Sequence, residues 1–257
     1  MIDINKIYNE NNVVTMAKID DGVIDGIITS PPYNVATKRH DKYYKNGYDD
    51  IDGLTEEEFI NTRFNEFKEF DRILTPKGVI CYNISYHILN PTLPLRLIIK
   101  VNDDTNLRLV DMISWKKSNS MPFNSSSNRL SRIVEQVYVF AHKDHFKNFT
   151  ANKTVAKINE RAKQKFYKYY NNFIEAKNND RLKSNLKASY SEEFVEKLLD
   201  IYFPIDSLIY DPFSGIGTTA RACIKKQRRF IASELKGEFY DDSIKYMPPK
   251  DIQTSLF

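Results

Sequence analysis

The sequence predicts an α/β fold with a mostly parallel sheet, and three observations lead to this prediction. Apolar runs typical of buried strands alternate with amphipathic, helix-like segments along most of the chain. Near the C-terminus, a glycine-rich turn stands between a strand-like and a helix-like segment. The 257 residues contain no internal repeat and no low-complexity linker, and they suffice for one large domain or for a core with an insertion.

Each expected element rests on a local pattern. Apolar runs rich in β-branched and aromatic residues predict strands at 23–29, 79–85, 107–117 and 133–143. Amphipathic patterns predict a helix at 54–74, where Thr55 and Glu58 form a capping box, the end of another helix at 95–104, and a helix at 191–203 capped by Ser191. Residues 206–235 predict strand, glycine loop, helix and strand, whereas 144–187 is expected to be helical and loop-like.

The net charge of +4 is unevenly distributed along the chain. Residues 143–187 contain twelve Lys or Arg and four Asp or Glu, so the rest of the chain is slightly acidic. This concentration of positive charge, with Lys beside aromatic residues in QKFYKYYNNF, predicts a segment that faces a polyanion. The alternative is a solvated basic surface without a partner.

Other features exclude several classes of protein. There is no run of 18 apolar residues, and the first residues lack the order of a secretory signal, so we expect no membrane contact. Two cysteines, Cys81 and Cys223, make no disulfide framework, and no Cys/His cluster indicates a metal. A cytoplasmic protein without a bound metal is therefore expected.

The segment TSPPYN, residues 29–34, ends an apolar run with two consecutive prolines. Because proline has no N–H, the strand must stop there, and Ser30 is pushed toward an extended conformation by the proline after it. The result is a short, stiff loop that holds its carbonyls, the Ser30 hydroxyl and the Tyr33 ring in fixed directions. These groups suit a site that needs hydrogen-bond acceptors beside a flat stacking surface. The alternative is a rigid turn with an exposed tyrosine.

A second motif, LIYDPFSGIGTTARACIKK at residues 208–226, has the pattern of a nucleotide-binding turn. An apolar strand ends at Asp211, two glycines permit a tight turn, and two threonines open a helix. The next strand ends at Glu234, where a carboxylate suits a ribose diol. Asp211 would repel a pyrophosphate and attract a cation, such as an ammonium group or the methionine part of a sulfonium compound.

Together, TSPPYN and DPFSGIGTT resemble the amino-group DNA methyltransferases, which use S-adenosylmethionine. SWKKSNSMP is similar to the tryptophan strand and following loop of that family, and FDRILTPKGVI to the helix, turn and strand after its catalytic loop, so the resemblance covers most of the chain. The catalytic motif precedes the cofactor motif, as in the beta class. The resemblance implies a Rossmann-like, mostly parallel methyltransferase sheet with helices on both faces and a small inserted target recognition region.

The resemblance also implies a division of the chain and a set of site residues. Residues 1–143 would form the catalytic part of the methyltransferase domain, 144–187 the target recognition region, and 188–257 the cofactor-binding part of the same domain. The implied catalytic residues are Ser30, Pro31, Pro32 and Tyr33. The implied S-adenosylmethionine-binding residues are Asp211, Pro212, Phe213, Ser214, Gly215, Gly217, Thr218, Thr219 and Glu234. The implied DNA-binding residues are Arg161, Lys163, Lys165, Tyr167 and Lys168.

These residue types fit the methylation of an amine. The lone pair of an exocyclic amine is delocalised into its base, and two acceptors on the N–H bonds localise that pair. The Ser30 hydroxyl and the Pro31 carbonyl can supply the acceptors, Tyr33 can stack on the base, and the base must leave the duplex to reach them. In-line transfer of the methyl group then needs positioning, but no metal and no covalent intermediate. Because stacking uses the ring face, Tyr33→Phe is expected to have a much milder effect than Tyr33→Ala.

The target base and the class of reaction stay open in part. In the family, SPPY is associated more with cytosine N4 and DPPY more with adenine N6, which favours cytosine N4 and leaves adenine N6 as the alternative. Ring-carbon methylation is rejected, because neither cysteine follows a proline. The sequence is also compatible with a nicotinamide oxidoreductase, a non-catalytic nucleic-acid-binding module, or a methyltransferase of RNA or protein. Beside duplex DNA, a cognate restriction endonuclease and a second copy of the chain are left open as partners.

Overall fold

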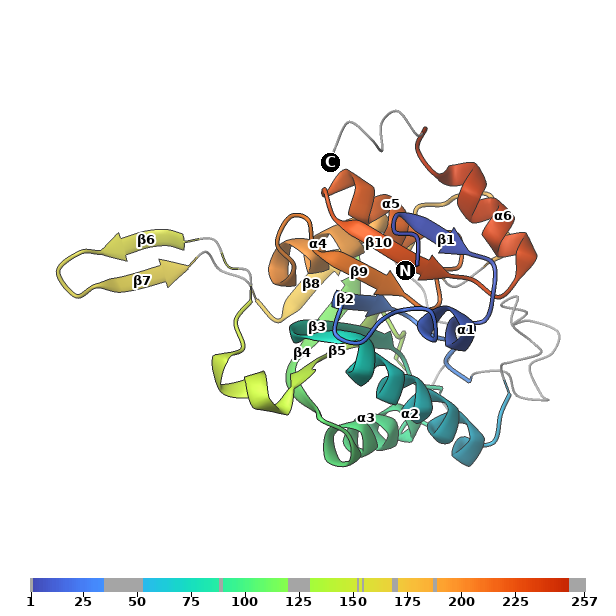
Figure 1. Cartoon of the computed structure of the whole chain (residues 1–257), viewed down its shortest axis with the longest axis horizontal. Helices are drawn as coiled ribbons and strands as arrows, with labels where there is room; N and C mark the ends of the chain where they lie inside the picture. Colours follow the sequence, from blue (N-terminus) through green and yellow to red (C-terminus); the bar gives the residue numbers. More distant parts are fainter. Residues whose placement is uncertain are drawn as a thin grey trace.

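The computed structural model describes residues 2–34, 53–87, 90–119, 130–151, 153, 155–167, 171–186 and 189–249. The main sheet contains, in chain order, β1 (Lys6–Tyr8), β2 (Ile24–Thr29), β3 (Leu74–Ile84), β4 (Leu107–Lys117), β5 (Val134–His142), β8 (Phe173–Ala176), β9 (Leu208–Asp211) and β10 (Arg229–Ser233). Its spatial order within the described residues is β1-β10-β9-β2-β3-β5-β4-β8 (Figure 1). Strands β6 (Val155–Asn159) and β7 (Gln164–Tyr167) form a separate antiparallel pair.

Most neighbouring strands of the main sheet are parallel. In the spatial order of the sheet, the successive strands β1, β10, β9, β2 and β3 all pair with one another in parallel. Strand β8 is parallel to β4. Only β5 is antiparallel to its two neighbours, β3 and β4. The predicted mostly parallel α/β sheet is therefore confirmed.

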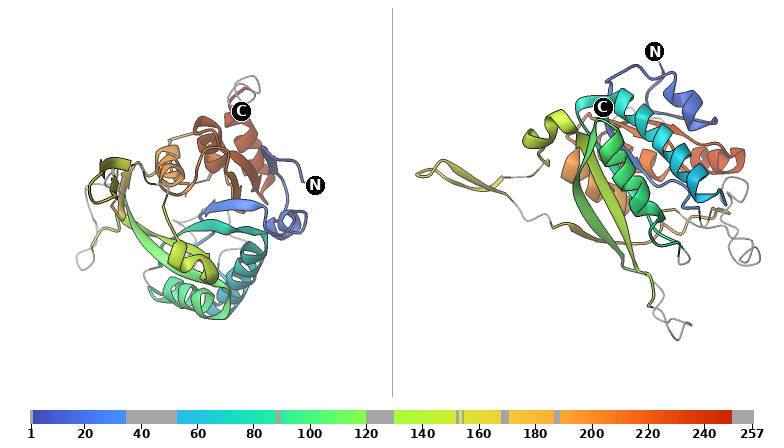
Figure 2. Two further views of the ribbon diagram at one scale, coloured as in Figure 1. Left: turned by 60° about the vertical axis from the view of Figure 1, so that its left-hand side comes forward. Right: turned by 90° about the horizontal axis from the view of Figure 1, so that it is seen from below.

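Helices cover both faces of the sheet because successive strand residues point to opposite sides. Ile27, Ile80 and Phe140 pack in one core with α1 (Asn12–Met16), α2 (Glu56–Ile73) and α3 (Leu93–Asp104). Their neighbours Ile28 and Cys81 pack in the other core, with α4 (Glu192–Tyr202) and α5 (Thr218–Lys225). Helix α6 (Gly237–Tyr246) adds Tyr240 to this second core. The two layers appear on opposite sides of the strands in the left panel of Figure 2.

Local signals fix the ends of the predicted helices. Thr55 and Glu58 form the reciprocal capping box at the start of α2, and the Ser191 hydroxyl accepts from the Phe194 N–H at the start of α4. Trp115 of β4 then stacks on Phe194, with ring centroids 4.2 Å apart, and both rings are buried. This contact fastens α4 to the antiparallel end of the sheet.

Among the described residues, no helix combines the length and apolarity needed to cross a membrane.

The structure differs from the sequence prediction in two places. Strand β3 begins at Leu74, directly after α2, and a register shift against β2 accommodates the TPKG segment that was expected to be a turn. For 144–187, the expectation of loops is confirmed in the described part, for example at 177–186, but strands take the place of the expected α-helix. After a short 3-10 helix, Lys143–Asn148, the chain forms the β6–β7 hairpin and then β8, which joins the main sheet. Residues 35–52 and 120–129 lie outside the described residues.

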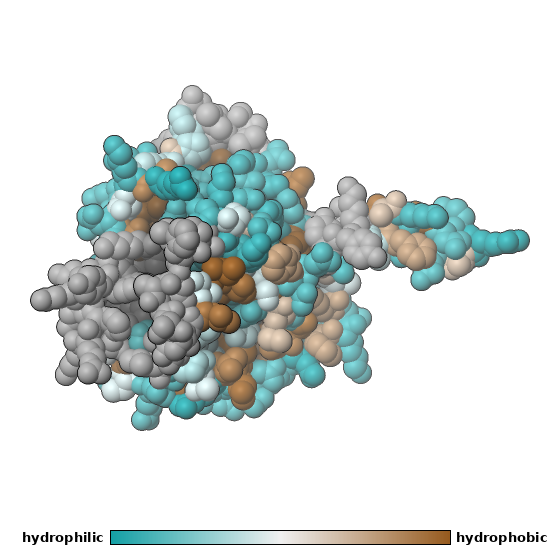
Figure 3. Space-filling model, turned by 180° about the vertical axis from the view of Figure 1, so that it is seen from behind, coloured by the Kyte–Doolittle hydropathy of each residue, from teal (hydrophilic) through white to brown (hydrophobic). Residues whose placement is uncertain are grey.

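The hairpin of residues 155–167, called the β6–β7 arm below, projects from the body of the protein (Figure 1). Every residue of the arm is exposed. Figure 3 shows hydrophilic and hydrophobic atoms side by side on it. Because all its residues are exposed, the arm gains little stability from burial. An isolated two-stranded hairpin also has little stability of its own in water.

Candidate active site

The two motifs found in the sequence meet at the carboxyl ends of β2 and β9. These strands pair in parallel, so the loops that follow them leave from the same edge of the sheet. Thr29, the last residue of β2, donates a hydrogen bond of 2.8 Å to Asp211, the last residue of β9. Ligands of open α/β sheets bind outside the carboxyl ends of strands, so this edge is the expected place for a site.

The loop after β2 is held by a network around the Tyr33 hydroxyl. This hydroxyl lies 2.7 Å from Ser30 Oγ and donates to Glu135 Oε2 at 3.1 Å. Asn83 Nδ2 lies 2.7 Å from the Tyr33 hydroxyl, 3.2 Å from Ser30 Oγ and 2.9 Å from Glu135 Oε2. Burial and the Glu135 carboxylate raise the pKa of Tyr33 well above its ordinary value, so the phenol stays protonated.

Three members of this neighbourhood were not found from the sequence. Asn83 is the last residue but one of β3, and Glu135 is the second residue of β5. Lys117, whose Nζ lies 2.5 Å from Glu135 Oε1, ends β4. These side chains meet because β5 lies between β3 and β4 in the sheet. The one available signal was an acidic residue within the otherwise apolar run IVEQVYVF.

The Asp211 carboxylate is engaged by the protein itself. It is 1% exposed and accepts from the Thr29 and Thr219 hydroxyls, from Tyr190 and from the Phe213 N–H. Burial raises its pKa, and these hydrogen bonds oppose that effect. The sequence predicted a carboxylate that attracts a cation, whereas in the structure Asp211 ties the end of β2, the glycine loop and α5 together. Tyr190, which precedes α4, was not predicted.

The glycine loop turns back onto the end of β10. Gly215 and Gly217 have positive φ angles of 53° and 77°, which glycine adopts without strain. The Gly215 N–H donates a bond of 2.8 Å to Glu234 Oε2, and the other oxygen of Glu234 accepts from the Lys236 N–H. The glycine loop and Glu234, which were both predicted to bind the cofactor, are therefore in direct contact.

Two buried polar atoms near these motifs lack a partner. Within the described part of the chain, Ser214 Oγ and Asn83 Oδ1 are buried and have no hydrogen-bond partner. Buried polar groups normally find a partner, so these two atoms are available to hydrogen-bond a bound group. One of the two lies in the glycine loop and the other beside the Ser30 hydroxyl.

The remaining predicted residues lie elsewhere or are accounted for otherwise. Arg161, Lys163, Lys165 and Tyr167 lie in the β6–β7 arm, whereas Lys168 lies outside the described residues. Cys81 and Cys223 are fully buried, and burial raises the pKa of both thiols, which agrees with the rejection of thiolate chemistry. No cluster of metal-binding side chains occurs in the described ranges.

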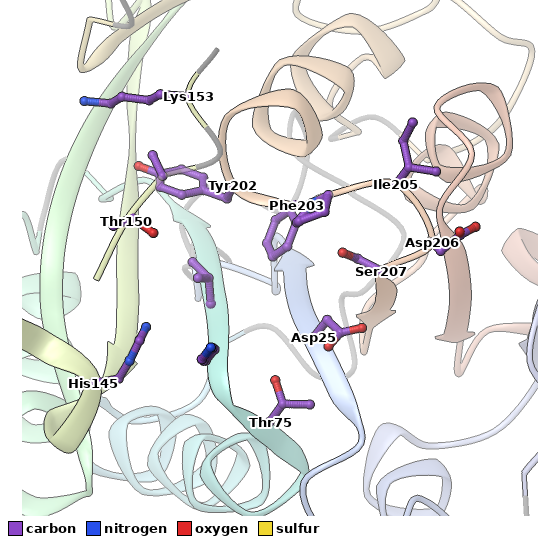
Figure 4. A pocket seen from close by; sticks show the side chains of 14 residues that line it. Asp25, Thr75, His145, Thr150, Lys153, Tyr202, Phe203, Ile205, Asp206 and Ser207 are labelled. Carbon is purple, nitrogen blue, oxygen red and sulfur yellow. The ribbon is translucent and has the colours of Figure 1, made fainter. Parts of the chain in front are cut away.

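A separate cavity of about 500 Å³ lies at the opposite edge of the sheet (Figure 4). It is lined by Asp25 near the start of β2, Thr75 near the start of β3, and Ser207 just before β9. Because these strands are parallel, their starts face away from the edge where the two motifs meet. None of the predicted catalytic or cofactor-binding residues lines this cavity, so we do not assign it to the same site.

Comparisons with known proteins identify the family of this chain. A sequence model of the N6/N4 methyltransferases, described as DNA methylase, matches residues 24–245. The type II methyltransferase M.BglII of Bacillus subtilis is 21% identical over 93% of this chain and 67% of its own length. The type II methyltransferase M.MjaI of Methanocaldococcus jannaschii is 22% identical over 86% of this chain and 84% of its own length.

Solved structures share the fold. The PvuII DNA methyltransferase (cytosine-N4-specific) matches with a TM-score of 0.72 and 18% identity, over 98% of this chain and 92% of that one. The M1.HpyAVI–SAM complex matches with a TM-score of 0.65 and 21% identity, over 93% of this chain and 97% of that one. With the family model spanning most of its length, this chain belongs to the DNA methylase family of S-adenosylmethionine-dependent amino-methyltransferases.

Proposed function

We propose that this DNA methyltransferase methylates the exocyclic N4 of a cytosine flipped out of duplex DNA. The observation that carries the proposal is the position of the Ser30 hydroxyl. Tyr33 and Asn83 hold it at the carboxyl end of β2, next to Asp211 at the end of β9. The serine in SPPY, where adenine-specific relatives tend to have aspartate, supports cytosine. The structural likeness to a cytosine-N4-specific enzyme supports it as well.

The residues of the glycine loop fit S-adenosylmethionine. The unpaired Ser214 hydroxyl and the N-terminus of α5 present polar groups that the loop itself leaves unused. Glu234, directly after β10, offers a carboxylate that would accept hydrogen bonds from the two hydroxyls of a ribose. When bound there, the cofactor supplies an electrophilic methyl group; the chain supplies its position.

The catalytic loop would act on the acceptor amine. The Ser30 hydroxyl and the Pro31 carbonyl accept hydrogen bonds from the two N–H groups of the amine. These bonds localise the lone pair of the nitrogen for attack. The Tyr33 ring stacks on the base, and the proline pair keeps both acceptors fixed during the reaction. Because these groups cannot reach a paired base, the target must leave the helix.

Nucleoside analysis distinguishes cytosine N4 from adenine N6. We expect DNA from a methylation-deficient bacterial host that expresses the chain to contain N4-methylcytosine, at one recognition sequence that single-molecule sequencing then identifies. A host carrying the Ser30→Ala variant is the control. N6-methyladenine in place of N4-methylcytosine would overturn the choice of base and leave the amino-methyltransferase assignment intact.

Glu234→Ala is expected to weaken S-adenosylmethionine binding by about 10- to 150-fold, because a hydrogen bond to a charged group contributes about 1.5–3 kcal/mol. The variant also removes the acceptor that holds the Gly215 N–H. Calorimetric titration with the cofactor measures the effect, with Glu238→Ala, in the first turn of α6, as the control. Unchanged affinity in Glu234→Ala would remove this residue from the cofactor site.

We further propose that the target recognition region, residues 144–187, contacts DNA through the β6–β7 arm. The arm is exposed along its whole length and carries Lys157, Arg161, Lys163 and Lys165 against one acidic residue, Glu160. A two-stranded β-ribbon fits the major groove of B-DNA. On one face, Lys157 lies opposite Phe166, so a cation and an aromatic ring are presented together.

Neutralising Lys163, Lys165 and Lys168 with glutamine is expected to weaken DNA binding and to reduce the slope of log affinity against log salt by about 3. The control carries glutamine at Lys68, Lys100 and Lys245, which lie on α2, α3 and α6 and give the same change in net charge. Binding is measured on unmodified duplex DNA over a series of salt concentrations. Equal slopes for the two triple variants would mean that the arm is a solvated surface.

The relatives suggest the biological setting. M.BglII and M.MjaI are named type II methyltransferases. By analogy, this chain would protect cytoplasmic DNA against an endonuclease that reads the same sequence. Size-exclusion chromatography with light scattering tests whether the chain acts as a homodimer.

A further inference from the structure

A chain of hydrogen bonds leads from Ser30 to a largely buried carboxylate. Ser30 Oγ lies 2.7 Å from the Tyr33 hydroxyl, which lies 3.1 Å from Glu135 Oε2. The other oxygen of Glu135 pairs with Lys117, and the two side chains are only 12% and 19% exposed. A tyrosine that merely stacks on a base has no need of this carboxylate.

The directions of the protons follow from the partners. An ionised carboxylate only accepts, so the Tyr33 hydrogen points to Glu135. Since that hydrogen is committed, the Ser30 hydroxyl must donate to the Tyr33 oxygen across their 2.7 Å contact. Ser30 therefore keeps its lone pairs for other groups. Glu135 also fixes the Asn83 amide, because only its NH₂ side can face a carboxylate at 2.9 Å.

We propose that Glu135 accepts the proton released by methyl transfer, through Tyr33 and Ser30, and that Asn83 aligns this route. The proposal rests on the proposed function, in which the acceptor amine lies against Ser30. When the amine nitrogen forms its bond to the methyl group, the electron pair of the broken carbon–sulfur bond stays on the sulfur of S-adenosylmethionine. The nitrogen is then positively charged and must lose a proton. That proton moves to Ser30 Oγ, the Ser30 hydrogen to the Tyr33 oxygen, and the Tyr33 hydrogen to Glu135 Oε2. Serine and tyrosine end neutral, and Glu135 ends protonated beside Lys117.

A neighbouring ion pair shows what a structural bridge looks like in this sheet. Lys116 Nζ lies 3.0 Å from Glu175 Oε1 and links β4 to β8, with both side chains substantially exposed. Lys117 and Glu135 link β4 to β5, which are already paired along their length just as β4 and β8 are, but this second ion pair is largely buried. The buried pair therefore adds little that the sheet lacks, while it places a negative charge at the end of the catalytic loop.

The route makes Tyr33 and Glu135 act as one unit. Removing the phenol hydroxyl with Tyr33→Phe, or the charge with Glu135→Gln, interrupts the same path. This replaces the mild effect of Tyr33→Phe expected from stacking alone. Both substitutions preserve side-chain shape, and thermal melting verifies that each variant is folded.

The test is a double-mutant cycle on single-turnover methyl transfer. The substrate is a synthetic duplex with the recognition sequence found by modification mapping, and the variants are Tyr33→Phe, Glu135→Gln, the double variant and the control Glu175→Gln. We expect each single variant to lower the rate about 100-fold, the low end of the effect of general acid–base catalysis. The double variant should be no slower than the slower single variant, and cofactor affinity should be unchanged. The solvent deuterium isotope effect of the wild-type protein should change in both single variants.

Four results separate the proposals. A normal rate in Glu135→Gln, or rate losses in the two single variants that multiply in the double variant, would overturn the proton route. An isotope effect that is the same in all variants would also overturn it, because a purely structural role leaves the proton transfer untouched. Failure of the wild-type protein to methylate any DNA amino group would instead overturn the proposed function.

Discussion

Tyr33→Ala is expected to abolish most methyl transfer while leaving S-adenosylmethionine affinity within about twofold of normal. Loss of base stacking alone should slow single-turnover transfer by about 5- to 150-fold, because base–aromatic stacking contributes about 1–3 kcal/mol. The variant also removes the hydroxyl that joins Ser30 to Glu135, so the total loss should exceed that of Tyr33→Phe. Rapid-quench assays with a labelled methyl group measure the rate, and calorimetry measures the affinity.

The control for this variant is Tyr246→Ala, a tyrosine of α6 whose hydroxyl donates to the Lys183 carbonyl. It should transfer methyl groups at the normal rate. If Tyr33→Ala does so as well, TSPPYN is only a rigid turn and the assignment of the catalytic loop is wrong. If Tyr33→Ala instead loses cofactor affinity in proportion to its rate, its role is structural.

Asp211→Ala is expected to lower both S-adenosylmethionine affinity and stability. The variant leaves three hydroxyls and the Phe213 N–H without their buried acceptor. An unsatisfied buried donor costs about 1–3 kcal/mol, and the Tyr190 and Thr219 hydroxyls can still bond each other, so we expect the free energy of unfolding to fall by about 2–4 kcal/mol. Cofactor affinity should fall at least about tenfold, because the glycine loop loses the charge-assisted hydrogen bond that Asp211 accepts from the Phe213 N–H.

Asp211→Asn separates geometry from charge. Its oxygen can still accept from Thr29 and Phe213, and the hydroxyls of Thr219 and Tyr190 can turn to face its NH₂ group, so most of the affinity should remain. An equal loss in Asn and Ala would restore the sequence-based view of Asp211 as the attractor of a cation. Normal cofactor affinity in Asp211→Ala, with denaturation curves showing a folded protein, would overturn the assignment of the glycine loop to cofactor binding.

The sequence was most informative where the relevant interactions are local. The strand, glycine loop and helix around Gly215 and Gly217 need particular residues in consecutive positions, and the capping box of Thr55 and Glu58 spans one helical turn. The β6–β7 arm was missed for a related reason. It buries no face, so its apolar residues show no period, and its Lys and aromatic residues read equally well as a basic helix surface.

The parts of the site that the sequence could not provide depend on strand order. Asn83 and Glu135 meet Tyr33, and Lys117 meets Glu135, only because β5 inserts antiparallel between β3 and β4, an order that no local pattern encodes. Likewise, Asp211 was recognised as a site residue, but its four donors come from three separate segments of the chain. Burial and partner number, which decide what a carboxylate can do, emerge only in the folded protein.

The most direct test is a crystal structure of the chain with duplex DNA and a non-reactive analogue of S-adenosylmethionine. Our account predicts a target base outside the helix, stacked on Tyr33, with its amino nitrogen about 3 Å from both Ser30 Oγ and the Pro31 carbonyl oxygen. The analogue should contact both the glycine loop and Glu234, with its sulfur in line with that nitrogen. A target base that remains in the duplex, or an amino group turned away from Ser30 and Pro31, would contradict the account.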